Sequence, residues 1–394
     1  MLTSRGRNRA LLVGVLLCFA SFAWGPQAGS QTAPVTRRPL ATLELPKGAP
    51  GNSFGASVAI SGSRILVGAP GVNGTGRAFV FSHLGRRWVE TAELKASGAS
   101  RGDEFGFFVA IDGATAVVGA PGPRAGSGHA YVFSYGAGRW HQVAKLAASD
   151  GRSGASFGAP VSISGSEIAV AAIPASNLSG RVYVFEYGSS GWKQVAELHG
   201  EPGGVFGTFL SIRGSSLLAI GLVKDRTRVY DFERRSGRWS QAGQLLVSNL
   251  KAGVDLTSVA LSGSFAVVGA PVLGFGEALV FKTVAGHWKR TAALSATAGL
   301  KDTGFGFSVC ASDNVIVVGD ALYASSVDHA YVYRLSAGTW TEAEVLVFPG
   351  EDLKLVGGTL DVERVIQEGV FGDTVVVGDG AYQSYRGRVD VFGV

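Results

Sequence analysis

Short apolar runs recur along this chain in pairs, and each pair is followed by an aromatic run. In the first copy, SVAIS at 57–61 and ILVGA at 65–69 flank a Ser-Gly turn, and AFVF at 78–81 comes next. Apolar or alternating runs of this length, bounded by Gly and Ser, predict short β-strands. No stretch after residue 33 keeps a helical period. The pattern therefore predicts an all-β fold.

The runs recur seven times at a nearly constant spacing. The residues that close the second run of each copy are Gly68, Gly119, Ala171, Gly221, Gly269, Gly319 and Gly378. The intervals between them are 51, 52, 50, 48, 50 and 59 residues. A fixed period of this size is the signature of a repeat architecture.

A tryptophan marks a fourth strand in the first six units, seven residues after the last aromatic residue of the third run. These tryptophans are Trp88, Trp140, Trp192, Trp239, Trp288 and Trp340. The residues in between are rich in Gly and Ser, which predicts a hairpin. Four strands per unit, repeated radially, form the blades of a β-propeller.

The two ends of the chain complete one another. The chain has seven sets of the first three strands but only six tryptophan strands, so the last unit lacks its fourth strand. Near the N-terminus, LATLEL at 40–45 resembles the fourth-strand sequence VETAEL at 89–94. We therefore expect a single seven-bladed propeller at 39–394 whose last blade is closed by the N-terminal strand, which removes an exposed edge. The expected blades are 50–95, 101–147, 153–199, 203–247, 251–295, 301–347, and 355–394 with 39–45.

Recurrent Phe-Gly pairs and Gly-Ala-Pro triplets resemble the FG-GAP repeat. The triplets stand at 68–70, 119–121 and 269–271, and the pairs begin at Phe54, Phe105, Phe157, Phe206 and Phe305. That repeat builds the seven-bladed propeller of integrin α subunits and of many secreted bacterial proteins. The resemblance implies extracellular or cell-surface recognition through loops on one face of the ring.

The resemblance also implies calcium loops between the first and second strands of several blades. Here those places hold short turns such as Ser61-Gly-Ser and Asp112-Gly-Ala, and no turn offers three carboxylates. Calcium prefers six to eight oxygen ligands, so we expect tight hairpins and no metal or other cofactor, with calcium in these turns as the alternative. The Phe-Gly phenylalanines are expected to be buried between blades. The tryptophans are expected to pack on neighbouring blades, with stacking on sugars as the alternative.

The N-terminal residues have the plan of a secretory signal. Three arginines precede an apolar run at 10–24, and small and polar residues follow. We expect a signal peptide at 1–30, cleaved between 24 and 33, then a linker at 31–38. Its removal lowers the formal charge from +5 to +2, because it carries three of the 35 basic residues and none of the 30 acidic ones. The remaining basic residues are not gathered into a stripe, so nucleic-acid binding is not expected. No transmembrane segment is expected in the mature chain.

No catalytic constellation stands out in the sequence. The six histidines are scattered, and Cys310 lies in an apolar run. We therefore predict a monomeric, non-enzymatic scaffold, secreted or on the cell surface, that binds an extracellular protein or glycan. The loops expected to bind are 71–75, 122–127, 320–328 and 348–363. The alternatives are a propeller lectin with repeated sugar sites and a polysaccharide-acting enzyme whose acids come from several blades. The candidate ligand-binding residues are Asp103, Asp150, Asp302, Asp320 and Asp379.

Overall fold

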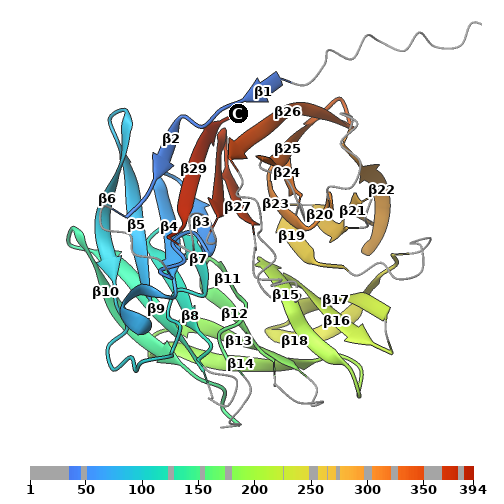
Figure 1. The fold of residues 1–394 in the computed structure, drawn as a ribbon. Helices are drawn as coiled ribbons and strands as arrows, with labels where there is room; N and C mark the ends of the chain where they lie inside the picture. The colour runs from blue at the N-terminus through green and yellow to red at the C-terminus, as the bar shows by residue number, and fades with distance from the viewer. Residues whose placement is uncertain are drawn as a thin grey trace, which may run out of the picture. The chain divides into compact units, whose positions relative to one another are not determined.

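A computed structural model describes most of the chain beyond the predicted signal peptide. The described residues are 35–45, 51–122, 128–150, 156–173, 180–224, 226–247, 256–263, 265–271, 276–296, 304–320, 327–349, 366–379 and 386–394. The expected signal peptide and Asp302 lie outside these ranges, as do most residues of the expected loops 122–127, 320–328 and 348–363. Figure 1 shows the described elements.

Each repeat unit forms one antiparallel sheet in which strand order follows the chain. Blade 1 contains β3 (Ser57–Ser61), β4 (Arg64–Ala69), β5 (Arg77–Leu84) and β6 (Arg87–Leu94), with a 3-10 helix, η1 (Val72–Gly74), between β4 and β5. Blade 2 contains β7 (Phe108–Asp112), β8 (Thr115–Ala120), β9 (His129–Gly136) and β10 (Arg139–Leu146). Blade 3 contains β11 (Val161–Ser164), β12 (Glu167–Ala172), β13 (Arg181–Gly188) and β14 (Gly191–His199). Blade 4 contains β15 (Val205–Arg213), β16 (Ser216–Val223), β17 (Arg226–Arg235) and β18 (Arg238–Leu245).

The remaining three blades follow the same plan. Blade 5 contains β19 (Ser258–Ser262), β20 (Phe265–Ala270), β21 (Glu277–Val284) and β22 (His287–Leu294). Blade 6 contains β23 (Ser308–Ser312), β24 (Val315–Gly319), β25 (Val327–Ser336) and β26 (Thr339–Pro349). Blade 7 contains β27 (Ile366–Phe371), β28 (Thr374–Asp379) and β29 (Arg388–Gly393). The first strands of neighbouring blades pack on one another all the way round, and β27 packs on β3. The prediction of a seven-bladed all-β propeller is confirmed.

Two N-terminal strands complete the ring. β2 (Ala41–Leu43) pairs with β29 in antiparallel register, with Thr42 opposite Asp390, and supplies the fourth strand of blade 7 as predicted. β1 (Val35–Arg37) pairs in parallel with β26 and adds a fifth strand to blade 6. In Figure 1 both blue strands lie beside the red and orange strands of the last two blades. The sequence placed residues 31–38 in a linker, and that prediction missed β1.

The hydrophobic core lies between neighbouring blades. At the boundary of blades 1 and 2, Leu66 and Val80 pack with Phe105, Val118 and Tyr131. In the five blades that carry the Phe-Gly pair, its phenylalanine lies in such a boundary and is buried; these are Phe54, Phe105, Phe157, Phe206 and Phe305. In blade 5, which lacks the pair, buried Leu256 takes that place. Each of the six repeat tryptophans is half-buried and packs on the cluster between its own blade and the preceding one.

The glycines of the repeat allow backbones of adjacent blades to touch. A Cβ on Gly68 of blade 1 would lie 1.9 Å from the carbonyl oxygen of Gly106 in blade 2. The amide of Gly106 in turn donates to the Gly119 carbonyl oxygen of its own blade, at 3.0 Å. Blade 3 carries Ala171 instead, and there the neighbouring blade stands further off. A Cβ on Gly207 of blade 4 would lie 3.5 Å from the Arg181 carbonyl oxygen of blade 3. At the equivalent place, a Cβ on Gly106 of blade 2 would lie 2.2 Å from the Arg77 carbonyl oxygen of blade 1.

Candidate ligand-binding face

The two faces of the ring differ in the connections that they carry. We call the connection face the side on which each second strand leads to the third and each blade leads to the next. The hairpin face is the opposite side, where the first and second strands, and the third and fourth strands, are joined by tight turns. All four described aspartates that the sequence proposed for ligand binding lie toward the connection face.

Repeated hydrogen bonds between blades tie the hairpin face together. Ser61 Oγ accepts from the Gly113 amide at 3.0 Å, and Asp112 Oδ2 accepts from the Gly165 amide at 2.7 Å. Ser164 and Ser262 accept in the same way from the next blade, at 3.1 and 2.7 Å. The turns at which the family resemblance implied calcium loops therefore hold structural bridges. Across the residues that the structure describes, His, Cys, Asp and Glu side chains form no group of three or more that could hold a metal ion.

On the connection face, one position at the start of the third strand varies between blades; it is the first residue of the strand in five blades and the third residue of β17 and β25. In chain order these residues are Arg77, His129, Arg181, Arg228, Glu277, His329 and Arg388. Two residues further along the third strand lies a residue that pairs with the fourth strand, as Phe79 pairs with Glu93 in blade 1. In chain order, the fourth-strand residues of these pairs are Glu93, Lys145, Glu197, Gln244, Ala293, Val345 and Thr42. The buried positions of the blades repeat, whereas this pair of positions carries five charge combinations over the seven blades: blades 1 and 3 share one, and blades 4 and 7 share another.

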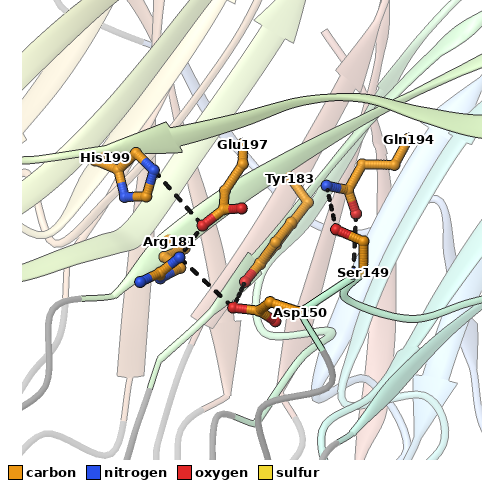
Figure 2. Close-up of polar contacts among 7 residues, drawn as sticks. All are labelled: Ser149, Asp150, Arg181, Tyr183, Gln194, Glu197 and His199. Atoms are coloured by element: carbon orange, nitrogen blue, oxygen red, sulfur yellow. Dashed lines mark hydrogen bonds and ion pairs between the residues drawn. The ribbon is translucent and has the colours of Figure 1, made fainter.

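In blade 3 the pair belongs to a network of ion pairs and hydrogen bonds (Figure 2). Arg181 contacts Glu197, and its Nη1 lies 3.5 Å from Asp150 Oδ2. The Tyr183 hydroxyl donates to the same Asp150 oxygen at 3.2 Å. His199 Nε2 lies 3.5 Å from Glu197 Oε1. The network therefore joins the loop that enters blade 3 to the third and fourth strands of that blade.

A second contact holds the same loop to the outer strand. Gln194 Nε2 donates to Ser149 Oγ at 2.9 Å, and the Ser149 amide donates to Gln194 Oε1 at 3.1 Å. The loop that enters blade 2 is held equivalently, because the Ser97 amide donates to Gln142 Oε1 at 2.9 Å. These loops are therefore fixed to the blades that they enter.

Blade 4 has a related network with a different acid. Arg228 Nη1 lies 2.6 Å from Glu201 Oε1, and Gln244 Nε2 donates to the same oxygen at 3.2 Å. The Tyr230 hydroxyl accepts from the Glu201 amide at 3.3 Å. Burial raises the pKa of Tyr230, so this hydroxyl stays protonated. The ends of Arg228 and Glu201 are partly open to solvent, with 38% and 39% of their side chains exposed.

In blade 6 the acid lies inside the blade. Asp320 is 0% exposed and occupies the position that is Ala69 in blade 1. Its Oδ1 accepts from the His329 amide at 3.0 Å, and its Oδ2 accepts from the Tyr331 hydroxyl at 3.5 Å. The Nδ1 of His329 lies 3.6 Å from that second oxygen. Burial raises the pKa of Asp320, and burial together with the Asp320 charge raises that of Tyr331.

In blade 7 the acids are also buried. Asp379 is 2% exposed and stands opposite Arg388 in the β28–β29 pair. Arg388 Nε donates to Asp390 Oδ2 at 2.9 Å, and the Thr42 hydroxyl donates to Asp390 Oδ1 at 2.6 Å. The closing strand β2 thus contributes a polar contact to a buried ion pair.

Comparison with known proteins agrees with the repeat seen in the sequence. The FG-GAP repeat family matches residues 40–81, 88–133 and 140–185. The chain carries FG-GAP repeats in these three segments. No curated protein matches it.

Solved structures resemble the FG-GAP propeller in fold. Hydrazine synthase of Kuenenia stuttgartiensis is 13% identical with a TM-score of 0.56, and the match covers 89% of this chain and 97% of that one. A protein from Lactobacillus plantarum is 16% identical with a TM-score of 0.51, covering 75% and 88% of the two chains. At these identities the likeness shows the fold alone. Within the described part of the FG-GAP chain, no helix has the length and apolar character needed to cross a membrane.

The FG-GAP propeller does not gather the sequence-proposed aspartates into one site. Asp103 accepts a hydrogen bond from the Ser100 amide at 2.7 Å at the boundary of blades 1 and 2. Asp150 belongs to the blade 3 network, whereas Asp320 and Asp379 are buried in blades 6 and 7. Asp302 lies outside the described residues.

Sequence reasoning missed the charged partners at the start of the third strand and the end of the fourth. One signal was available, because a glycine precedes Arg77, His129, Arg181, Glu277 and Arg388. Each of these residues therefore occupies a fixed place in the repeat.

The loop expected at 320–328 is shorter than predicted, since Val327 already belongs to β25.

Proposed function

We propose that this propeller is a non-enzymatic recognition scaffold that binds an extracellular protein or glycan through its connection face. The contrast between the two faces carries the proposal. Serine and aspartate bridges repeat on the hairpin face, whereas the connection face presents five charge combinations over the seven blades. Variable chemistry on the loops of a rigid scaffold is typical of a binding surface.

The charged groups of blades 3 and 4 are arranged for binding. Ion pairs and hydrogen bonds hold Arg181, Glu197 and Arg228 in place, and His199 keeps 52% of its side chain exposed. Groups that are already ordered lose less conformational freedom when a ligand binds. They therefore support a preorganised patch that spans the boundary of these blades.

An extracellular location is part of the proposal. It is supported by the signal-like sequence at 1–30. The described residues contain one thiol, Cys310, and so cannot form an internal disulfide among themselves; packing holds them together, as the apolar clusters between blades indicate.

Two double variants test which face binds. In the connection-face variant, His199→Ala is combined with Arg228→Ala. In the hairpin-face variant, Arg87→Ala is combined with Arg139→Ala, which changes two exposed arginines at the start of outer strands. The wild type and both variants are applied to a glycan array and to an array of extracellular proteins.

We expect the connection-face variant to bind its ligand at least about tenfold more weakly, since each lost charged contact contributes on the order of 1 kcal/mol or more. The hairpin-face variant should bind like the wild type. Loss of binding in the hairpin-face variant alone would contradict the proposal, as would turnover on ester or polysaccharide panels. Several equivalent sugar sites per chain would instead indicate a lectin.

A further inference from the structure

Blade 2 departs from the charge pattern of its neighbours. In blades 1 and 3 the arginine that opens the third strand contacts a fourth-strand glutamate, as Arg77 contacts Glu93 at 2.9 Å. Blade 2 has His129 at the opening position and Lys145 where blade 3 has Glu197. The outer strand of blade 2 therefore supplies a cation where blades 1 and 3 supply a carboxylate.

A buried hydroxyl in blade 2 lacks the partner that its counterparts have. Tyr131 is 0% exposed, and its hydroxyl makes no hydrogen bond within the described structure. The hydroxyls of Tyr183 and Tyr331 donate to Asp150 and Asp320, and the hydroxyl of Tyr230 accepts from the Glu201 amide. Leaving a buried hydroxyl unpaired is unfavourable, so an acceptor is expected at this position.

The acid of the entering loop does not fill this place. Asp103 accepts its hydrogen bond from the Ser100 amide at 2.7 Å. Its charge still acts on the site. The pKa of Tyr131 is raised, mainly by burial and to a smaller extent by the negative charge of Asp103. The hydroxyl therefore remains a donor.

Two side chains that can donate lie beside the Tyr131 ring. Lys145 Nζ lies 5.6 Å from the centre of the Tyr131 ring, and the His129 ring lies 6.1 Å from it. Burial and the Lys145 charge lower the pKa of His129, while Asp103 opposes this effect. Lys145 is exposed, so a ligand group arriving from solvent can reach it.

We infer that Tyr131, His129 and Lys145 form a subsite for a carboxylate group of the ligand. Toward the tyrosine, this group takes the place that Asp150 has beside Tyr183 in blade 3, and its negative charge replaces that of the glutamate Glu197. It accepts from the Tyr131 hydroxyl and pairs with the Lys145 ammonium, and such charge-assisted bonds are the strong ones. The inference rests on the proposed function in placing the ligand on the connection face, and it names one chemical group of that ligand.

Two small carboxylates and their neutral counterparts test the subsite. The full chain is titrated with glucuronate and with N-acetylglutamate, and in parallel with glucose and N-acetylglutamine, by ligand-observed NMR and calorimetry. The variants are Tyr131→Phe, which removes the hydroxyl, and Lys145→Glu, which installs the internal carboxylate of blade 3. The control is Lys193→Glu, the same charge change at an exposed position of β14.

We expect the carboxylates to bind in the millimolar range and the neutral compounds not to bind. Tyr131→Phe should weaken binding about tenfold, Lys145→Glu should abolish it with a Tm at or above that of the wild type, and Lys193→Glu should change it less than about twofold. The stronger of the two carboxylates tells whether the group belongs to an acidic sugar or an acidic amino acid.

Undiminished binding in Lys145→Glu would overturn the inference. So would equal binding of the neutral compounds, or no carboxylate binding, which would leave a water molecule as the partner of Tyr131. The proposed function can fail separately. If the arrays give a connection-face ligand while neither carboxylate binds, the subsite alone is wrong, and if the carboxylates bind but the ligand contacts the hairpin face, the proposed function alone is wrong.

Discussion

Substitution of Gly68 by alanine should open the boundary between blades 1 and 2. The added Cβ would lie 1.9 Å from the Gly106 carbonyl oxygen, whereas an ordinary contact needs at least 3.4 Å. The two backbones would have to separate by the difference, about 1.5 Å. A flexible side chain could move aside, but here the obstacle is a backbone carbonyl whose residue is hydrogen-bonded to Gly119.

The cost follows from what this boundary packs. Phe105, Val109 and Tyr131 fill it together with Leu66 and Val80. A gap of about 0.5–1 Å already forfeits a quarter to a half of a van der Waals contact, and overpacking a core costs about 1–3 kcal/mol, occasionally more. We expect a loss of about 3 kcal/mol in the free energy of unfolding. In a domain of this size, that corresponds to a fall in Tm of about 4 °C.

The assay is urea denaturation of Gly68→Ala beside Gly243→Ala, followed by tryptophan fluorescence. Gly243 also lies in a strand, but a Cβ there would meet no atom within 4 Å. The control variant should be as stable as the wild type, or slightly more so, because alanine restricts the unfolded chain. A Gly68→Ala protein within about 0.5 kcal/mol of wild type, the ordinary range for surface changes, would refute the account of the repeat glycines.

Three further measurements test other parts of the structure. Thr42→Val removes the hydroxyl that donates to buried Asp390 and should lower the free energy of unfolding by about 1 kcal/mol, whereas Thr36→Val should not; equal curves would contradict a role in ring closure. Burial raises the pKa of Asp320 in the folded protein. The protonated carboxyl therefore stabilises the fold fully at pH values below 3.8, the ordinary pKa of this group, and the stabilisation is lost as the pH rises through the raised pKa. Asp320→Asn should therefore flatten the decline in stability between pH 4 and pH 8 in urea titrations, and an unchanged slope would show that this carboxyl is not responsible. Excess EGTA should change Tm by less than about 1 °C, because no bound calcium is expected. Calcium bound only to the folded state would stabilise it, so a drop of several degrees on chelation would reveal calcium.

Much of the fold could be predicted because its signals are local and repeated. Short apolar runs, hairpin glycines and tryptophans in register predict four strands per unit, and β4 (Arg64–Ala69) begins one residue from the expected ILVGA run. The N-terminal closure was also predictable, since LATLEL resembles the other outer strands. β1 was missed because three residues carry no pattern of their own, and the strand forms only by pairing with β26, about 300 residues away.

The candidate site could be predicted only in part, because it depends on pairings between blades. Sequence reasoning placed Asp150 near a strand end, but its contact with Tyr183 joins a loop to a strand 33 residues later. Asp320 was placed similarly, yet the structure buries it, since its position in the repeat faces the interior of a blade boundary. The bridge from Ser61 to Gly113 spans 52 residues, about one repeat. Aligning the units with one another, rather than analysing each turn alone, would have predicted that bridge.

The central claim is that the connection face binds the ligand. Hydrogen–deuterium exchange of the free and ligand-bound propeller tests this most directly, because both faces contain backbone amides that can report. The account predicts slower exchange on binding in the loops 71–76, 101–104 and 200–204, with unchanged exchange at the hairpin turns 62–63, 113–114, 165–166 and 214–215. Protection at those hairpin turns without protection of the loops would contradict it.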